Sequence, residues 1–136
     1  METNFNFKSQ PCTTVEQSER LLALGLKKET ADVIIPIKFN PEKGPILVHQ
    51  DFWISDDPFY QNMRENSIPA WSLGRLLEMM PQIIDLHDFV LFHTCAGYIN
   101  NDYHIKAGFN GTFFDACISC IEWLINEELF NKEYLV

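Results

Sequence analysis

Polar positions recur with a helical period in the last long apolar stretch, residues 112–129. The polar residues up to position 126 are spaced four, three and four apart, which places them on one narrow stripe of a helix: Asp115, Ser119, Glu122 and Asn126. The rest of the circumference is apolar. A helix that is apolar over most of its girth must be covered on more than one side. The pattern therefore predicts a central C-terminal helix, with a sheet beneath it and another helix or a second subunit beside it.

An amphipathic helix is predicted near the N-terminus, after an aperiodic segment. Thr13 and Glu16 have the spacing of a capping box, in which each side chain accepts the other residue's backbone N–H. Gly25 is expected to end this helix, because glycine adopts the left-handed conformation at low cost, and Leu26 is placed to fold back on the last turn. Residues 1–11 are expected to form a flexible N-terminal arm.

Residues 33–39 are rich in β-branched side chains and predict an extended segment. Pro36 cannot donate a hydrogen bond, so this segment is expected to be either an edge strand or an extended segment that is not part of a sheet. Residues 40–44 have turn composition, and residues 45–49 are expected to pair back on the first strand. Between Gln50 and Asn66 the pattern fails, and an ordered loop and a short helix both remain open.

A second helix is indicated in residues 68–81, where Ser72 is a good N-cap and Pro81 closes the segment. Residues 89–96 are strand-like, with Phe89, Leu91, His93 and Cys95 on one side. A turn at residues 100–102 and a return strand at 103–107 would complete an antiparallel hairpin. Thr112 then resembles the N-cap of the final helix.

The order of these elements predicts an α+β fold. Strands joined by hairpins, with helices grouped on one face, describe a two-layer domain: a small antiparallel sheet packed against about three helices, with the C-terminal helix central. A chain of 136 residues is long enough to bury a core of its own. Residues 12–136 are therefore expected to form a single domain.

The charge of the chain limits its partners. Nineteen acidic residues against ten Lys and Arg give a net charge of −9. Binding to a nucleic-acid backbone needs clustered cations, so it is not expected. The acidic surface can serve solubility, or it can mimic nucleic acid towards a basic partner, and both remain open. No signal peptide and no apolar run approaching ~18 residues is present, so a cytoplasmic location without membrane contact is expected.

Three blocks of the chain resemble a known group of proteins: Cys12 to Gly25 with Thr30-Ala-Asp32, Ile68-Pro-Ala-Trp-Ser-Leu to Pro81, and Asp115-Ala-Cys with Trp123-Leu-Ile125. They are similar to an uncharacterised family of small proteins encoded in prophages and mobile elements of gut bacteria. The resemblance implies an accessory role in such an element. It brings no activity, ligand or site residue with it, and it does not extend over residues 39–66.

Four residues could in principle form a tetrahedral zinc site or hold a small ligand: His93, Cys95, Cys117 and Cys120. Cys117 and Cys120 stand one helical turn apart, but both fall on the apolar face of the C-terminal helix. Because free cysteine is among the most buried residue types, packing in the core is the favoured role, and no metal or cofactor is expected. The chain also lacks a phosphate-binding loop and the local signatures of hydrolases, so no catalytic residue is nominated and an enzyme is not favoured.

The most suggestive residues for function are three aromatics in the irregular segment: Trp53, Phe59 and Tyr60. Exposed aromatics on a surface segment are typical anchors of protein interfaces. Alternatively, the rings fold back as a lid on the core. The leading hypothesis is a small acidic cytoplasmic protein-interaction module, an adaptor that acts through a protein partner or through a second copy of itself. The alternative is a zinc- or ligand-binding protein that uses His93 and the three cysteines.

Overall fold

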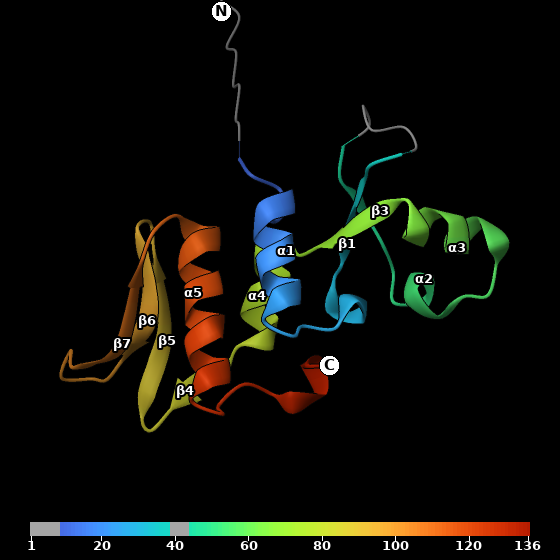
Figure 1. Cartoon of the computed structure of the whole chain (residues 1–136). Coiled ribbons are helices and arrows are strands. Elements are labelled where there is room, and N and C mark those ends of the chain that lie inside the picture. Colours follow the sequence, from blue (N-terminus) through green and yellow to red (C-terminus); the bar gives the residue numbers. More distant parts are fainter. Residues whose placement is uncertain (1–8, 39–43) are drawn as a thin grey trace, which may run out of the picture.

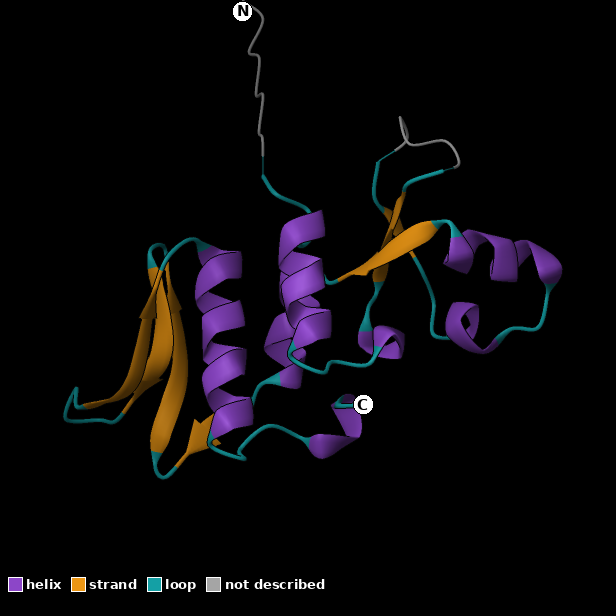
Figure 2. Ribbon diagram, viewed as in Figure 1, coloured by secondary structure: helices purple, strands orange, loops and turns teal. Residues whose placement is uncertain are grey.

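The chain folds into two antiparallel sheets with a layer of helices between them (Figure 1), and the computed structural model describes residues 9–38 and 44–136. The α-helices are α1 (Val15–Ala23), α2 (Asp51–Ile54), α3 (Pro58–Glu65), α4 (Leu73–Met79) and α5 (Phe113–Asn126), and two short 3-10 helices are η1 (Lys28–Thr30) and η3 (Lys132–Tyr134). One sheet has the order β2-β1-β3, formed by β2 (Ile46–Leu47), β1 (Val33–Pro36) and β3 (Ser67–Ala70). The other has the order β4-β5-β6-β7, formed by β4 (Ile83–Ile84), β5 (His87–Phe92), β6 (Cys95–Ile99) and β7 (Ile105–Asn110). The α+β class is as predicted, with two sheets in place of one (Figure 2).

The C-terminal helix α5 lies between the four-stranded sheet and the pair α1 and α4 (Figure 1). Thr112 caps it by accepting the N–H of Asp115 at 3.4 Å. Its buried residues are Phe114, Ala116, Cys117, Ile118, Cys120, Ile121 and Leu124. Burying one large aliphatic side chain contributes roughly 1.5–3 kcal/mol, so this helix supplies a large part of the stabilising burial. The predicted cover on more than one side of this helix is confirmed.

Helix α1 is capped one residue later than the sequence predicted. Thr14, not Thr13, is the N-cap, and it forms a reciprocal capping box with Gln17. Thr13 is buried, and its hydroxyl is used elsewhere: it accepts the backbone N–H of Trp71 at 3.0 Å and shares a hydrogen bond of 2.7 Å with Ser18. The two adjacent threonines thus divide the tasks of capping and of core hydrogen bonding.

The end of α1 was predicted correctly. Gly25 has a φ of 103°, and its N–H donates to the carbonyl of Leu22 at 3.0 Å. The N–H of Leu26 donates to the carbonyl of Leu21 at 3.2 Å, and Leu26 is buried. These two bonds are those of a Schellman motif, which satisfies the last carbonyls of the helix.

The prediction that residues 33–39 form an edge strand is wrong, because β1 is the central strand of its sheet. Pro36 pairs with Ser67 of β3, whereas β2 pairs only with Val33 and Ile34. The N–H of Ile37 bonds to Asn66 next to β3. Since successive backbone nitrogens face opposite neighbours, the nitrogen of Pro36 faces the side that β2 does not reach. The proline is therefore tolerated inside the sheet.

Other predictions for the middle of the chain are partly confirmed. The return strand is present as β2, while the turn predicted at residues 40–44 falls mostly on residues 39–43, outside the described residues. Ser72 caps α4 by accepting the N–H of Arg75 at 3.1 Å. Residues 68–70 belong to strand β3 and not to that helix, because the residue before Pro69 is biased towards extended conformations.

The single strand predicted over residues 89–96 is interrupted by a turn at His93 and Thr94. The chain reverses there, so that Phe89 pairs with Tyr98 and their rings lie 5.5 Å apart. His93 and Cys95 therefore do not continue the face of Phe89, which corrects the predicted strand face. The reversal turns the predicted hairpin into a meander that continues through β7.

The described ends of the chain are tied to the fold. Most of the predicted N-terminal arm, residues 1–8, lies outside the described residues; in the rest, the Gln10 amide donates to the carbonyl of Cys12 and to Gln17 Oε1, both at 2.7 Å. At the other end, the N–H of Val136 donates to the carbonyl of Gly25 at 2.8 Å. Within residues 9–38 and 44–136, none of the helices is both long enough and apolar enough to cross a bilayer.

Candidate interaction surface

Residues 44–66 carry β2, α2 and α3, and these two helices project from the body on the side away from the four-stranded sheet (Figure 1). We name this segment the α2–α3 lobe. Asp57 caps α3 by accepting the N–H of Phe59 at 2.9 Å, and Pro58 occupies the first helical position. Such a start is favourable because proline there loses no helical hydrogen bond. Of the two structures that the sequence left open, the short helix is the one that forms, and it forms twice.

A chain of packed aromatic rings connects the α2–α3 lobe to the core. The ring of Phe52 lies 5.0 Å from that of Trp53 and 5.7 Å from that of Tyr60, and Phe59 follows 6.0 Å from Tyr60. Trp53 is buried, and its indole N–H donates to the carbonyl of Ala31 at 2.9 Å. The expectation of an exposed Trp53 is thus wrong, and the lid interpretation holds for this residue. Phe59 and Tyr60 stay at the surface.

The surface of the α2–α3 lobe is apolar at its centre. The exposed fractions are 66% for Phe59, 38% for Tyr60, 70% for Ile54 and 77% for Leu47. Between β2 and the two helices lies a hollow of about 380 Å³, whose walls include Leu47, Phe59 and Tyr60. Rings that are already held by packing lose little entropy when a partner covers them, which favours their use as anchors.

Arg64 joins the two helices of the α2–α3 lobe. Its guanidinium donates to the carbonyl of Phe52 and, at 2.8 Å, to that of Ser55, and it lies 5.9 Å from the centre of the Phe52 ring. The carbonyls at a helix end have no helical partner, so Arg64 satisfies acceptors that α2 leaves open. Arg64 is the only Lys or Arg in residues 44–66. Because its guanidinium is bonded to backbone carbonyls, the four acidic side chains of residues 44–66 outweigh it at the surface of the lobe.

The structure does not assemble the predicted zinc ligands. Cys117 and Cys120 are fully buried in α5, and burial raises the pKa of these thiols to about 11 and about 12. Cys95 is half-buried on β6, and His93 lies exposed in the β5–β6 turn, where its ring packs 5.5 Å from Phe113. Zinc binds the thiolate, which these raised pKa values disfavour. In the described part of the chain, no group of three or more His, Cys, Asp or Glu is placed to hold a metal ion.

A larger hollow of about 960 Å³ opens beside the start of α5. Its walls come from several segments distant in the sequence: Gln10, Leu73, His93, Asn110, Thr112 and Phe113 are among them. No local sequence signal could have predicted it, because the walls meet only through the packing of these segments. His93, a candidate ligand in the sequence, belongs to this hollow and not to a cysteine cluster.

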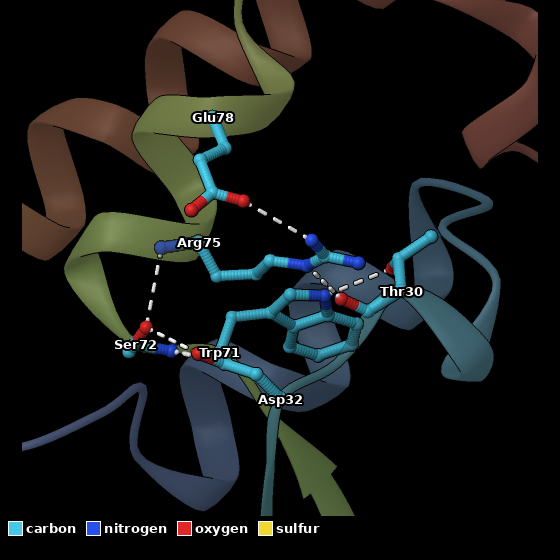
Figure 3. A network of polar contacts seen from close by, with 6 residues as sticks. All are labelled: Thr30, Asp32, Trp71, Ser72, Arg75 and Glu78. Carbon is cyan, nitrogen blue, oxygen red and sulfur yellow. Dashed lines mark hydrogen bonds and ion pairs between the residues drawn. The ribbon is translucent and has the colours of Figure 1, made fainter. Parts of the chain in front are cut away.

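A polar network lies where η1, β1 and α4 meet (Figure 3). The carboxylate of Asp32 accepts the N–H and the hydroxyl of Ser72 at 2.9 and 2.5 Å. The indole N–H of Trp71 donates to the Thr30 hydroxyl at 2.9 Å, and Arg75 Nε donates to the Thr30 carbonyl at 2.7 Å. Among the described residues, no buried side-chain nitrogen or oxygen lacks a partner. The network therefore holds the segment of Thr30 and Asp32 against the start of α4. Its polar groups are occupied by one another and are not directed at a ligand.

Two of the three sequence blocks singled out in the sequence analysis meet in this network. Thr30 and Asp32 come from one block, and Trp71 and Ser72 from another. Comparison of the chain with protein-family models, with curated proteins and with solved structures gave no match. The chain's own geometry therefore carries the functional proposal.

Proposed function

We propose that the protein is a small acidic protein-interaction module that contacts its partner through the α2–α3 lobe. The observation that carries the proposal is the exposure of Phe59 and Tyr60 above the buried rings of Phe52 and Trp53. Aromatic side chains at the centre of an interface commonly supply most of its binding free energy. A second copy of the chain is one candidate partner, which would make the module a homodimer.

The four-stranded sheet also exposes apolar side chains. Ile83 and Ile105 lie on the two edge strands, Phe92 lies at the end of β5, and Leu86 and Tyr103 lie in turns. On the α2–α3 lobe, in contrast, Leu47, Phe59 and Tyr60 line one hollow. A contiguous patch with a concave centre is the better support for a contact surface.

The proposal extends to the setting of the protein. The resemblance of the three sequence blocks supports an accessory or adaptor role in a prophage or mobile element, acting in the cytoplasm. The side chains that the blocks contribute serve the fold in part, as the network around Asp32 and Ser72 illustrates. The resemblance does not cover residues 39–66, so the partner would be specific to this chain.

Affinity capture with the full chain tests this proposal. The wild type is compared with the Phe59→Ala/Tyr60→Ala variant and with Tyr103→Asn, a control that removes a more exposed ring (82% exposed) from the turn between β6 and β7. The φ of Tyr103 is 61°, which asparagine tolerates well. Because the ring of Phe59 is mostly exposed, the double variant should keep its fold at a loss of about 1 kcal/mol.

The capture has two informative outcomes. Loss of a bound protein, or of a dimer mass in light scattering, from the double variant but not from Tyr103→Asn supports the contact surface. The same captured proteins and the same mass for all three chains would contradict it.

A second candidate function, the binding of a small apolar ligand, is favoured by the hollow of about 960 Å³ beside α5. Its volume lies in the usual range for small-molecule sites, and Leu73 and Phe113 supply apolar wall while His93 and Asn110 supply polar groups. Native mass spectrometry of protein from its own host should then detect a small-molecule adduct that Leu73→Trp abolishes. Spectra of the bare chain alone would exclude this function.

A further inference from the structure

We infer that the occupant of the α2–α3 lobe is a basic protein segment, which presents a large apolar side chain flanked by Lys or Arg. This inference rests on the proposed function and specifies the chemistry of the partner. It follows from the charges of the lobe, from the apolar side chains that line the hollow and from the backbone of Leu47, which faces away from β1.

The charges of the α2–α3 lobe are one-sided. Residues 44–66 contain four acidic side chains against one arginine. All four are exposed: Asp51, Asp56, Asp57 and Glu65. The arginine, Arg64, donates to backbone carbonyls of the lobe itself. The exposed side chains of residues 44–66 therefore carry a net negative charge.

Two of the four acids lie next to the apolar anchors. Asp51 belongs to the wall of the hollow, and its side chain is 83% exposed. The carboxylate of Asp57 accepts the backbone N–H of Phe59. The one ionisable base in the same wall, His49, has Nδ1 3.8 Å from the carboxylate of Asp51. Acids this close to the hollow attract or repel any charged group that lies beside an apolar side chain bound in it.

This arrangement decides between classes of partner. A phosphate backbone or an anionic lipid surface would be repelled by the exposed acids of the lobe, whereas Lys and Arg would be attracted. Like charges brought together at an interface are strongly unfavourable, so these acids also disfavour acidic protein segments. The apolar hollow in turn requires a side chain that can leave water, which a simple polycation does not provide.

The backbone of β2 offers a place for the main chain of such a segment. Ile46 pairs with Ile34, and the N–H of Val48 donates to the carbonyl of Asp32 at 2.9 Å, so both residues direct their N–H groups towards β1. Since successive residues of a strand face opposite neighbours, the N–H and C=O of Leu47 face away from β1. An extended segment can add to this edge and place one side chain in the hollow, which Leu47 also lines.

Selection from a library of short random peptides displayed on phage, with the immobilised full chain as target, tests this inference. Synthetic copies of the selected peptides are then titrated by fluorescence anisotropy against four proteins. These are the wild type, Phe59→Ser, the triple variant Asp51→Asn/Asp56→Asn/Glu65→Gln, and a control triple variant Glu19→Gln/Glu127→Gln/Glu133→Gln. The control removes the same number of exposed acids outside the lobe, so it accounts for attraction by the net charge alone.

The selected peptides are expected to carry a large apolar residue flanked by Lys or Arg. Their affinity should fall about tenfold or more for Phe59→Ser and for the lobe triple variant, and clearly less for the control triple variant. Added salt should weaken binding to the wild type more than to the lobe triple variant. Peptides without excess Lys or Arg, equal losses for the two triple variants, or a failure to select any peptide would each overturn the inference.

The two proposals fail in different ways. If the natural partner still requires Phe59 and Tyr60 but is indifferent to the lobe acids, the interaction module stands and only the basic nature of its partner is wrong. If capture of the natural partner does not depend on Phe59 and Tyr60, the proposed function itself fails.

Discussion

Raising the pH above about 9 is expected to destabilise the fold through the two buried thiols of α5. Desolvation raises the pKa of Cys117 from 9.0 to about 11; desolvation, with a smaller effect of the neighbouring Cys117, raises that of Cys120 to about 12. Between the unfolded and the folded pKa, the folded chain binds more protons than the unfolded chain. The free energy of unfolding therefore falls as the pH rises through this window, whereas below it the full contribution is present.

The size of the effect follows from the shifts. One unit above the ordinary value, at about pH 10, an unfolded thiol is mostly ionised while both folded thiols remain protonated. Each thiol then lowers the free energy of unfolding by roughly 1 kcal/mol relative to neutral pH, and the loss continues to the folded pKa. Both side chains are fully buried, so solvent screens little of this difference.

Urea unfolding of the reduced protein at about pH 8 and about pH 10 measures the loss. The comparison is with Cys117→Ala/Cys120→Ala, which is expected to start about 1–2 kcal/mol less stable because two small cavities form. The buried Tyr98, whose pKa desolvation also raises, is present in both proteins, so its contribution largely cancels in the comparison. Between about pH 8 and about pH 10, the free energy of unfolding should fall by roughly 2 kcal/mol less in the variant than in the wild type. Equal losses would show that the thiols are accessible to solvent, and would refute their burial.

Three further predictions concern single residues. Asp32→Ala removes both acceptors of Ser72 and should cost about 2–3 kcal/mol in urea unfolding, whereas Asp32→Asn, which keeps one acceptor, should cost about 1 kcal/mol. Gly25→Ala should lower the free energy of unfolding by about 1–2 kcal/mol because the φ of Gly25 is 103°, although no atom lies within 4 Å of an added Cβ. Gly74 is exposed on α4, so Gly74→Ala should instead raise the free energy of unfolding by about 0.5–1 kcal/mol. Arg64→Ala should cost about 2 kcal/mol and speed amide hydrogen exchange in α2 more than in α5, because it leaves the carbonyls of Phe52 and Ser55 without their donor. A Gly25→Ala variant of unchanged stability, or exchange in α2 that ignores Arg64, would contradict the local structure described.

The parts of the fold that could be predicted from the sequence are those set by neighbours in the chain. The narrow polar stripe that contains Asp115 and Glu122 predicted that the rest of α5 is enclosed. Both residues accept hydrogen bonds from α1: Glu122 from Arg20 at 2.7 Å and Asp115 from Gln17 at 2.7 Å. Gly25 marked the end of α1 because the left-handed conformation is a property of a single residue. These signals involve residues close together in the chain, so the sequence alone is sufficient to predict α5 and the end of α1.

Other features depend on residues that are distant in the chain. Pro36 argued for an edge strand, and only the shortness of β2 lets it lie in a central one. The fates of Trp53, Phe59 and Tyr60 differ because Trp53 finds the carbonyl of Ala31, more than twenty residues away. Composition cannot tell which of several aromatic residues finds such a partner. For the same reason the net negative charge at the surface of the α2–α3 lobe emerged only when the inward position of Arg64 was known.

Site-specific photo-crosslinking tests most directly the central claim that the protein acts through its α2–α3 lobe. The photoreactive amino acid p-benzoyl-phenylalanine replaces Phe59 in one protein and Tyr103 in another, and both are irradiated in cells that naturally carry the gene. Both positions are mostly exposed, at 66% and 82%, so their general reactivity is matched. A light-dependent adduct of defined mass at position 59 and none at position 103 is the predicted result. Adducts at position 103 alone, or at neither position, would contradict the account.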